Sequence, residues 1–135
     1  MKNLEQIRAA NALTYAKAAE AGANTRGTKG GEVVKKLPAL VMSNGLLAAG
    51  AFAYAKGEGE GWYVCFDHLA VHLAHKDVGV VPDDKRDLKA LLEYLTKEGD
   101  SGTLQQATDE ALAWLCYAKR FVKKANGKGG DDDSN

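Results

Sequence analysis

The sequence predicts an all-α protein, a compact single-domain bundle of about five to seven helices with a central apolar helix. Apolar residues recur at helical spacing over most of the chain, and no two segments read as paired strands. The 135 residues, 45% hydrophobic and 27% charged, suit one globular domain. We assign residues 1–126 to this domain, with a glycine-rich loop at about 22–34. Residues 127–135 are expected to form a disordered acidic tail.

The longest uncharged stretch covers nineteen residues, 37–55. Its length would suffice to cross a bilayer, but polar residues in its middle and its many Ala and Gly residues argue against a membrane span. We therefore expect no membrane partner. The stretch predicts one helix over residues 35–57, with Pro38 in its first turn and apolar side chains on nearly every side. A buried Asn44 would then need hydrogen-bond partners.

The remaining helices follow from spacing and end signals. Residues 4–21 show helical periodicity, and residues 62–76, although rich in strand formers at their start, favour a helix. Pro82 and the acids after it open another helix, and Thr103 with Gln106 forms a capping box for the last one. That last helix carries one apolar stripe, made of Ala107, Ala111, Trp114, Leu115, Ala118, Phe121, Val122 and Ala125.

The cysteines and the N-terminus indicate a compartment. Cys65 and Cys116 each lie in an apolar run without a C-x-x-C pair, which is typical of buried thiols in a reducing compartment, although the sequence leaves one disulfide open. Residues 1–22 lack an apolar core followed by a cleavage site. We therefore expect a cytoplasmic protein.

A net charge of zero conceals segregated charges. Residues 1–36 carry seven Lys/Arg and three Asp/Glu, residues 37–110 carry six and twelve, and residues 111–128 carry five and none. The basic residues gather at the start of the central segment and on the last helix, where no acid interrupts them. Such a cluster is either a solvated face or a surface for phosphates.

Two other patterns could carry chemistry. His68, His72 and His75 could lie near one helical face, as zinc ligands do, but the H-E-x-x-H pattern is absent, and half-exposed histidines on an amphipathic helix are the commoner case. Residues 22–31 contain glycines like those of a phosphate-binding loop, but Thr28-Lys29 replaces the required Lys-Ser/Thr order and no strand precedes them. We read them as a linker. No nucleophile with a base and no carboxylate pair is evident, so we predict no enzyme, no metal and no cofactor.

Three blocks resemble a known family: LEQIRAANALTYA, KKLPALVMSNGLLAAGAFA and ATDEALAWLCYAKRF. The most specific elements are L-P-A-L, N-G-L-L and A-F in the central block, followed by W-L and K-R-F in the last. In these blocks the sequence resembles the small all-helical subunit of the Cmr effector complex, the type III-B CRISPR RNA-guided silencing machine. The blocks cover roughly two-fifths of the chain in the family's order, and the histidine trio matches nothing in the family pattern.

The resemblance implies a structural subunit of antiviral defence without catalytic residues of its own. Such subunits stack beside the backbone subunits that hold the CRISPR RNA and help to form the groove for the target RNA. The implied partners are other Cmr subunits, neighbouring copies of this chain, CRISPR RNA and target RNA. The matched basic positions are Arg8, Lys35, Lys36, Lys119 and Arg120, and the local charge pattern adds Lys123 and Lys124. For Arg8 the alternative of a pair with acids on the bundle surface stays open.

Two alternatives stay open at the level of sequence. The first is a helical protein–protein interaction module whose basic stripe meets an acidic partner without RNA. The second is a small metal-dependent hydrolase built on His68, His72 and His75.

Overall fold

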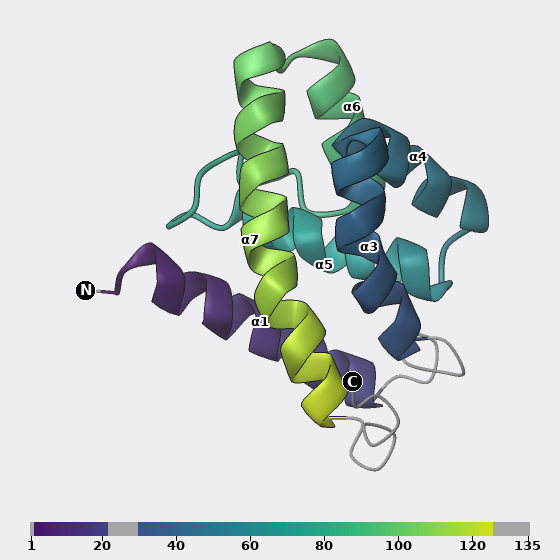
Figure 1. The fold of residues 1–135 in the computed structure, drawn as a ribbon. Helices are drawn as coiled ribbons and strands as arrows, with labels where there is room; N and C mark the ends of the chain where they lie inside the picture. Colours follow the sequence, from purple (N-terminus) through teal and green to yellow (C-terminus); the bar gives the residue numbers. More distant parts are fainter. Residues whose placement is uncertain (1, 22–29, 126–135) are drawn as a thin grey trace.

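A computed structural model describes residues 2–21 and 30–125, which contain six helices and no strand. Helix α1 spans Leu4–Ala21, α3 Gly30–Asn44, α4 Leu46–Lys56, α5 Gly61–Ala74, α6 Leu88–Lys97 and α7 Ser101–Ala125. Helix α7 runs the length of the molecule, α1 crosses its lower half, and α5 lies in the middle of the bundle (Figure 1). The predicted all-α single bundle is confirmed.

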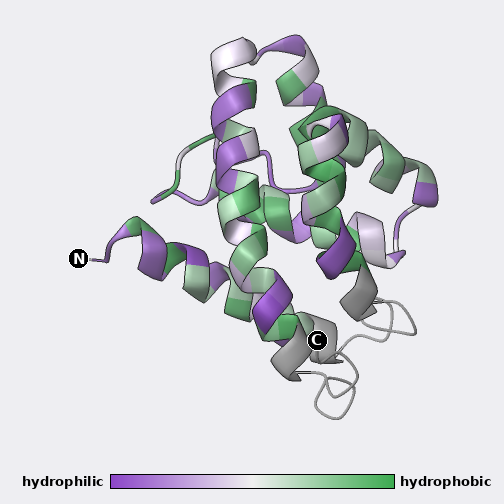
Figure 2. Ribbon diagram, viewed as in Figure 1, coloured by the Kyte–Doolittle hydropathy of each residue, from purple (hydrophilic) through white to green (hydrophobic). Residues whose placement is uncertain are grey.

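The core lies where α1, α3, α5 and α7 meet. Hydrophobic residues concentrate on the sides of the helices that face one another (Figure 2). The predicted stripe of α7 is buried at each described position except Phe121, which is half-buried, and Ala125 lies outside the described side chains. The largest of these residues, Trp114, is fully buried between the rings of Tyr15 on α1 and His72 on α5. One aromatic side chain thus connects three helices.

The central segment differs from its prediction, because two helices replace the single one expected. Helix α3 begins at Gly30, so residues 30–34 of the expected loop are helical and Pro38 lies inside the helix, not in its first turn. Gly45 then adopts φ 94° and ψ 159°, a combination open essentially to glycine alone, and separates α3 from α4. Asn44 is exposed, not buried, at this break. Met42 is 74% exposed, so one apolar side of the segment faces water instead of the core.

The predicted helix starts were also displaced at two places. Helix α6 begins at Leu88, six residues after Pro82, because the Asp87 carboxylate accepts a hydrogen bond from the Ala90 N–H at 2.8 Å and caps it. Helix α7 begins before Thr103, whose own N–H donates to Asp100 Oδ1 at 2.8 Å. Asp100 is therefore the cap, and the predicted capping box is wrong. The helices over 4–21 and 62–76 are confirmed as α1 and α5.

The remaining expectations concern the cysteines, the linker and tail, and a membrane span. Both cysteines are free, and Cys65 is buried as predicted, whereas Cys116 is exposed on α7. Burial raises the pKa of the Cys65 thiol to about 12, which leaves it protonated and unreactive at neutral pH. Residues 22–29 of the linker expected at 22–31, and the tail expected at 127–135, lie outside the described residues, whereas Gly30 and Gly31 belong to α3. No helix in the described ranges is long and apolar enough to cross a membrane.

Candidate RNA-contacting surface and the buried network behind it

The outer side of α7 carries the first candidate residues. Its buried stripe points Ala118 and Val122 inward, and the residues between them, Lys119 and Arg120, are exposed. This confirms the predicted orientation of the helix. Lys123 and Lys124 continue the same helix, but their side chains lie outside the described part of the structure.

Helix α3 brings the second pair of candidates to the same end of the molecule. Lys35 and Lys36 are exposed near its start, while Val33, Val34 and Leu37 face the core. Helices α3 and α7 are in contact and run in opposite directions, so the first turns of α3 lie toward the same end as the last described turns of α7 (Figure 1). We call Lys35, Lys36, Lys119 and Arg120 the basic end.

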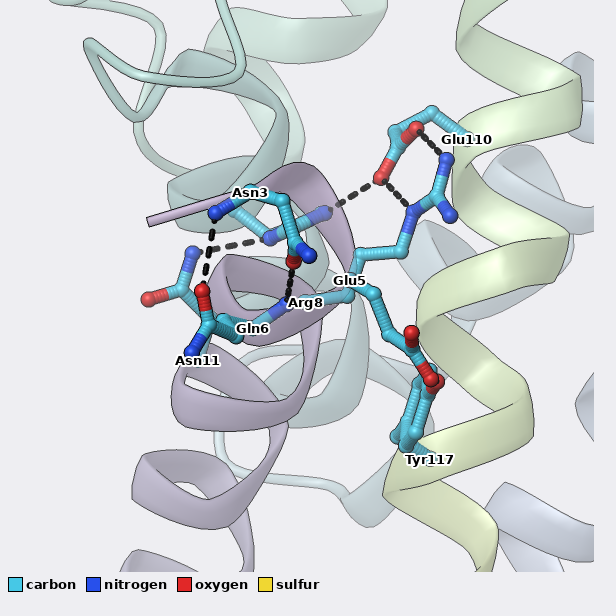
Figure 3. Close-up of polar contacts among 8 residues, drawn as sticks. Asn3, Glu5, Gln6, Arg8, Asn11, Glu110 and Tyr117 are labelled. Carbon is cyan, nitrogen blue, oxygen red and sulfur yellow. Dashed lines mark hydrogen bonds and ion pairs between the residues drawn. The ribbon is translucent and has the colours of Figure 1, made fainter. Parts of the chain in front are cut away.

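Arg8 is placed differently, since its guanidinium binds a carboxylate of α7. Its Nε donates to Glu110 Oε2 at 2.7 Å and its Nη2 donates to Oε1 at 2.8 Å (Figure 3). This bidentate geometry is the strong form of an Arg–carboxylate pair, and it raises the pKa of Arg8. The Arg8 side chain is 26% exposed. The pair joins α1 to α7, and contact of Arg8 with RNA stays a prediction.

His72 extends this pair into a buried network. Its ring is fully buried, with Nε2 2.9 Å from Glu110 Oε2 and Nδ1 2.9 Å from the Asn11 side-chain nitrogen. An amide nitrogen can only donate, so Nδ1 accepts and Nε2 carries the hydrogen that Glu110 accepts. Arg8, Glu110, His72 and Asn11 thus connect α1, α5 and α7, and we call them the buried network.

The ionisation states within the buried network agree with one another. Burial lowers the pKa of His72 more than the hydrogen bond to Glu110 raises it, so the imidazole is neutral at pH 7. Burial also opposes ionisation of Glu110, but the hydrogen bonds from Arg8 and His72 outweigh it and hold the pKa of Glu110 below its usual value. The network therefore contains one cation, one anion and one neutral ring.

The histidines do not converge on a common point. His72 uses both ring nitrogens in the buried network, and His68 packs its ring against Tyr15 at 5.1 Å between centroids. His75 lies beyond the end of α5, where its Nδ1 accepts from the Asp77 N–H. Within the described residues, no three His, Cys, Asp or Glu side chains are grouped so as to hold a metal ion.

Sequence reasoning missed the buried network, although one signal for it was present. Glu110 falls between Ala107 and Trp114 at the three- and four-residue spacing of the apolar stripe. A carboxylate at a stripe position is buried and therefore needs a cation or hydrogen-bond donors. Which residues supply them depends on how α1 crosses α7, and that crossing is not encoded in local spacing.

Comparison with known proteins agrees with this fold. Residues 4–125 match the family described as CRISPR-associated protein (Cas_Cmr5). The chain belongs to the Cmr5 family. Cmr5 is a subunit of the type III-B Cmr complex, so the resemblance in the three sequence blocks is confirmed. No match was found among curated proteins.

A solved structure supports the same assignment. The crystal structure of a CRISPR-associated Cmr5 family protein from Thermus thermophilus matches with a TM-score of 0.69 and 28% sequence identity. The match covers 92% of this chain and 97% of that chain. The two proteins therefore share this helical fold over most of both chains.

Proposed function

We propose that this chain is a non-catalytic structural subunit of a Cmr ribonucleoprotein, that it stacks beside the backbone subunits and neighbouring copies of itself, and that its basic end contacts CRISPR RNA or target RNA. Membership of the Cmr5 family supports association with other Cmr subunits. The proposal places the chain in the cytoplasm, where such a complex would act in antiviral defence.

The observation that carries the RNA contact is the exposure of Lys119 and Arg120 beside the start of α3. Lys119 is followed four positions on by Lys123, and Arg120 by Lys124, and like charges at this helical spacing repel one another, so they add no stability to the bundle. They are available on the outer surface at the same end of the molecule as Lys35 and Lys36. Lysine and arginine side chains at one end suit phosphate groups, whose binding releases counterions. Lys123 and Lys124 would extend this surface along α7.

The test is a double substitution, Lys119→Glu with Arg120→Glu, in complexes of verified composition. RNA affinity should fall about tenfold near 0.1 M salt, and the slope of log affinity against log salt should flatten by roughly 0.7–0.9 for each lost phosphate contact. Base preference should not change, because guide pairing reads the sequence of the target. Circular dichroism should show that helicity is kept.

The matched control makes the same change of charge elsewhere, with Lys76→Glu and Lys97→Glu. Both lysines are exposed, one after α5 and one in the last turn of α6. This control should leave the affinity and the slope close to those of the unmutated complex. If the α7 double variant also matches it, the basic end does not contact RNA, and the alternative of a protein–protein module with an acidic partner is favoured.

A further inference from the structure

An open groove of about 530 Å³ lies between α4 and α6. Helix α4 contributes Leu47, Ala48, Ala51 and Tyr54, and α6 contributes Lys89, Leu92, Glu93 and Thr96. The two helices touch beside the groove at Gly50, where an added Cβ would lie 2.8 Å from Leu92 Cδ2. The spacing 47, 51, 54 on α4 and 89, 92, 96 on α6 follows the helical repeat, so the groove has the form of a channel between two helices.

Aromatic side chains extend the groove at the end of α4. Tyr54 is 48% exposed and stacks on Tyr63 at 6.0 Å between centroids. On the next side of α4, Phe52 is 43% exposed, and the Lys56 Nζ lies 5.0 Å from the centre of its ring. The surface thus already holds one cation over an aromatic face, an arrangement that is favourable by about 0.5–1 kcal/mol at exposed sites.

Carboxylates lie near Tyr63 at this aromatic end. Glu58, Asp67 and Asp87 lie close enough to raise the pKa of Tyr63, after burial, and Glu93 lines the groove itself. Asp67 and Asp87 each accept one backbone hydrogen bond in the first turn of α6. In the described ranges none of the four carboxylates forms an ion pair with a lysine or arginine. The surface is therefore apolar along its floor. Its aromatic end carries a net negative charge, because these four carboxylates outnumber the two lysines there, Lys56 and the groove-lining Lys89.

These features select the class of partner. The excess of carboxylates over lysines repels phosphates, which disfavours RNA. A stable interface between two copies needs about 20–30 residues a side, far more than the few that line the groove. The groove is instead the size for one segment of a protein chain. Lysine or arginine beside apolar residues would satisfy both its charge and its floor.

We infer that the α4–α6 groove receives a segment of another Cmr subunit, which places apolar side chains on the Ala48–Ala51–Leu92 floor and a lysine or arginine near Tyr54 and Glu58. This inference rests on the proposed function for the identity of the partner. The groove lies on α4 and α6, whereas the basic end lies at the start of α3 and the end of α7 (Figure 1). The two surfaces therefore differ in location and in charge.

The test measures how well variant chains compete with the unmutated chain for incorporation into the complex. Equal amounts of unmutated and variant full-length chain, distinguished by mass, are offered to the other Cmr subunits of the same cell, and the incorporated ratio is measured. Ala51→Glu should be under-represented at least tenfold. Ala55→Glu is the matched control, since Ala55 is exposed on the same helix outside the groove, and it should be incorporated within twofold of the unmutated chain.

A second pair of variants tests the charge. Glu93→Lys should reduce incorporation two- to fivefold, more strongly at low salt, whereas Glu98→Lys, exposed just after α6 and outside the groove, should have little effect. Glu93 is exposed, so this variant keeps the test valid if Ala51→Glu does not fold.

Several outcomes would overturn the inference. Equal incorporation of folded Ala51→Glu, or equal loss of Ala55→Glu, would show that the groove is not the contact. If nuclease treatment removes the difference in incorporation between Ala51→Glu and the unmutated chain, the groove is assigned to RNA. Self-association of the isolated chain that Ala51→Glu abolishes would assign it to a second copy. Failure of the unmutated chain to enter the complex would overturn the proposed function as well, whereas the first four results leave that function intact.

Discussion

Glu110→Gln should lower the free energy of unfolding by about 2 kcal/mol. The amide has nearly the shape of the carboxylate, so packing is unchanged, but one of its two ends is a donor that faces the N–H groups of Arg8 or His72. Removing one partner of a fully buried ion pair costs about 3–5 kcal/mol. The Arg8 side chain is 26% exposed and is partly solvated by water, which reduces the expected loss.

The assay is urea unfolding followed by circular dichroism at pH 7.5, with equal denaturant slopes for the proteins compared. A loss of about 2 kcal/mol corresponds to a melting temperature lower by roughly 8 °C for a domain of this size. Asp109→Asn is the control. Its carboxylate is exposed and accepts only from Gln105 at 3.0 Å among the described residues, a bond that an amide oxygen can keep. The control should stay within about 0.5 kcal/mol of the unmutated protein.

A double-mutant cycle assigns the loss to the ion pair. Arg8→Met, Glu110→Gln and their combination should show a coupling of about 1 kcal/mol or more, because each single change leaves the other group without its partner. Additive effects, or a Glu110→Gln protein as stable as the unmutated one, would refute the claim that the buried network holds α1 on α7. The cycle also separates the structural role of Arg8 from any contact with RNA.

Two further predictions concern pH and the break between α3 and α4. The folded state lowers the pKa of His72 below the usual 6.5, so the unfolded chain binds more protons below that pH. The free energy of unfolding should therefore fall as the pH drops from about 6.5. It should fall again below about 4.5 as Glu110 is protonated, because the folded state also lowers the pKa of Glu110. Burial lowers the pKa of His68 as well, so His72→Gln should reduce the first decline and leave the part that His68 contributes. Urea unfolding at several pH values measures this difference, and a pH profile identical to that of the unmutated protein would contradict the assignment. Gly45→Ala should lower the free energy of unfolding by about 1–3 kcal/mol. An added Cβ meets no atom within 4 Å, so the loss comes from the backbone conformation at positive φ alone. Gly102→Ala, inside the first turn of α7, should leave the free energy of unfolding unchanged or raise it. If both Gly45→Ala and Gly102→Ala lower the free energy of unfolding, the strain argument is wrong.

The sequence predicted those parts of the fold that depend on local periodicity. The stripe on α7 determined which side of that helix is buried, and it correctly placed Lys119 and Arg120 on the outer surface. The helix breaks were harder to predict, because Gly45 sits within the long uncharged stretch, where no charge or proline marks the end of a helix. Pro38 was read as a helix start for a related reason, since its local preference does not reveal that α3 begins at Gly30.

The buried network could not be predicted in the same way, because its members are separated by up to 102 positions in the chain. Arg8 looked like a basic surface residue, and His72 looked like one of three equivalent histidines. Their roles depend on the crossing of α1 over α5 and α7, which brings a carboxylate from the apolar stripe within reach of both. Long-range polar pairs of this kind are decided by tertiary packing.

The separation of the two proposed surfaces gives opposite expectations for two sets of variants. Charge reversal at Lys119 and Arg120 should weaken RNA binding without excluding the chain from the complex, because the α4–α6 groove is untouched. Ala51→Glu should reduce the amount of chain incorporated, but each incorporated chain should keep its RNA contact. The two effects can be measured on the same preparations, as RNA affinity per incorporated subunit and as the incorporated ratio. If either set changes both quantities in a folded protein, RNA binding and subunit docking are not independent, and the basic end and the groove must act through one shared interface.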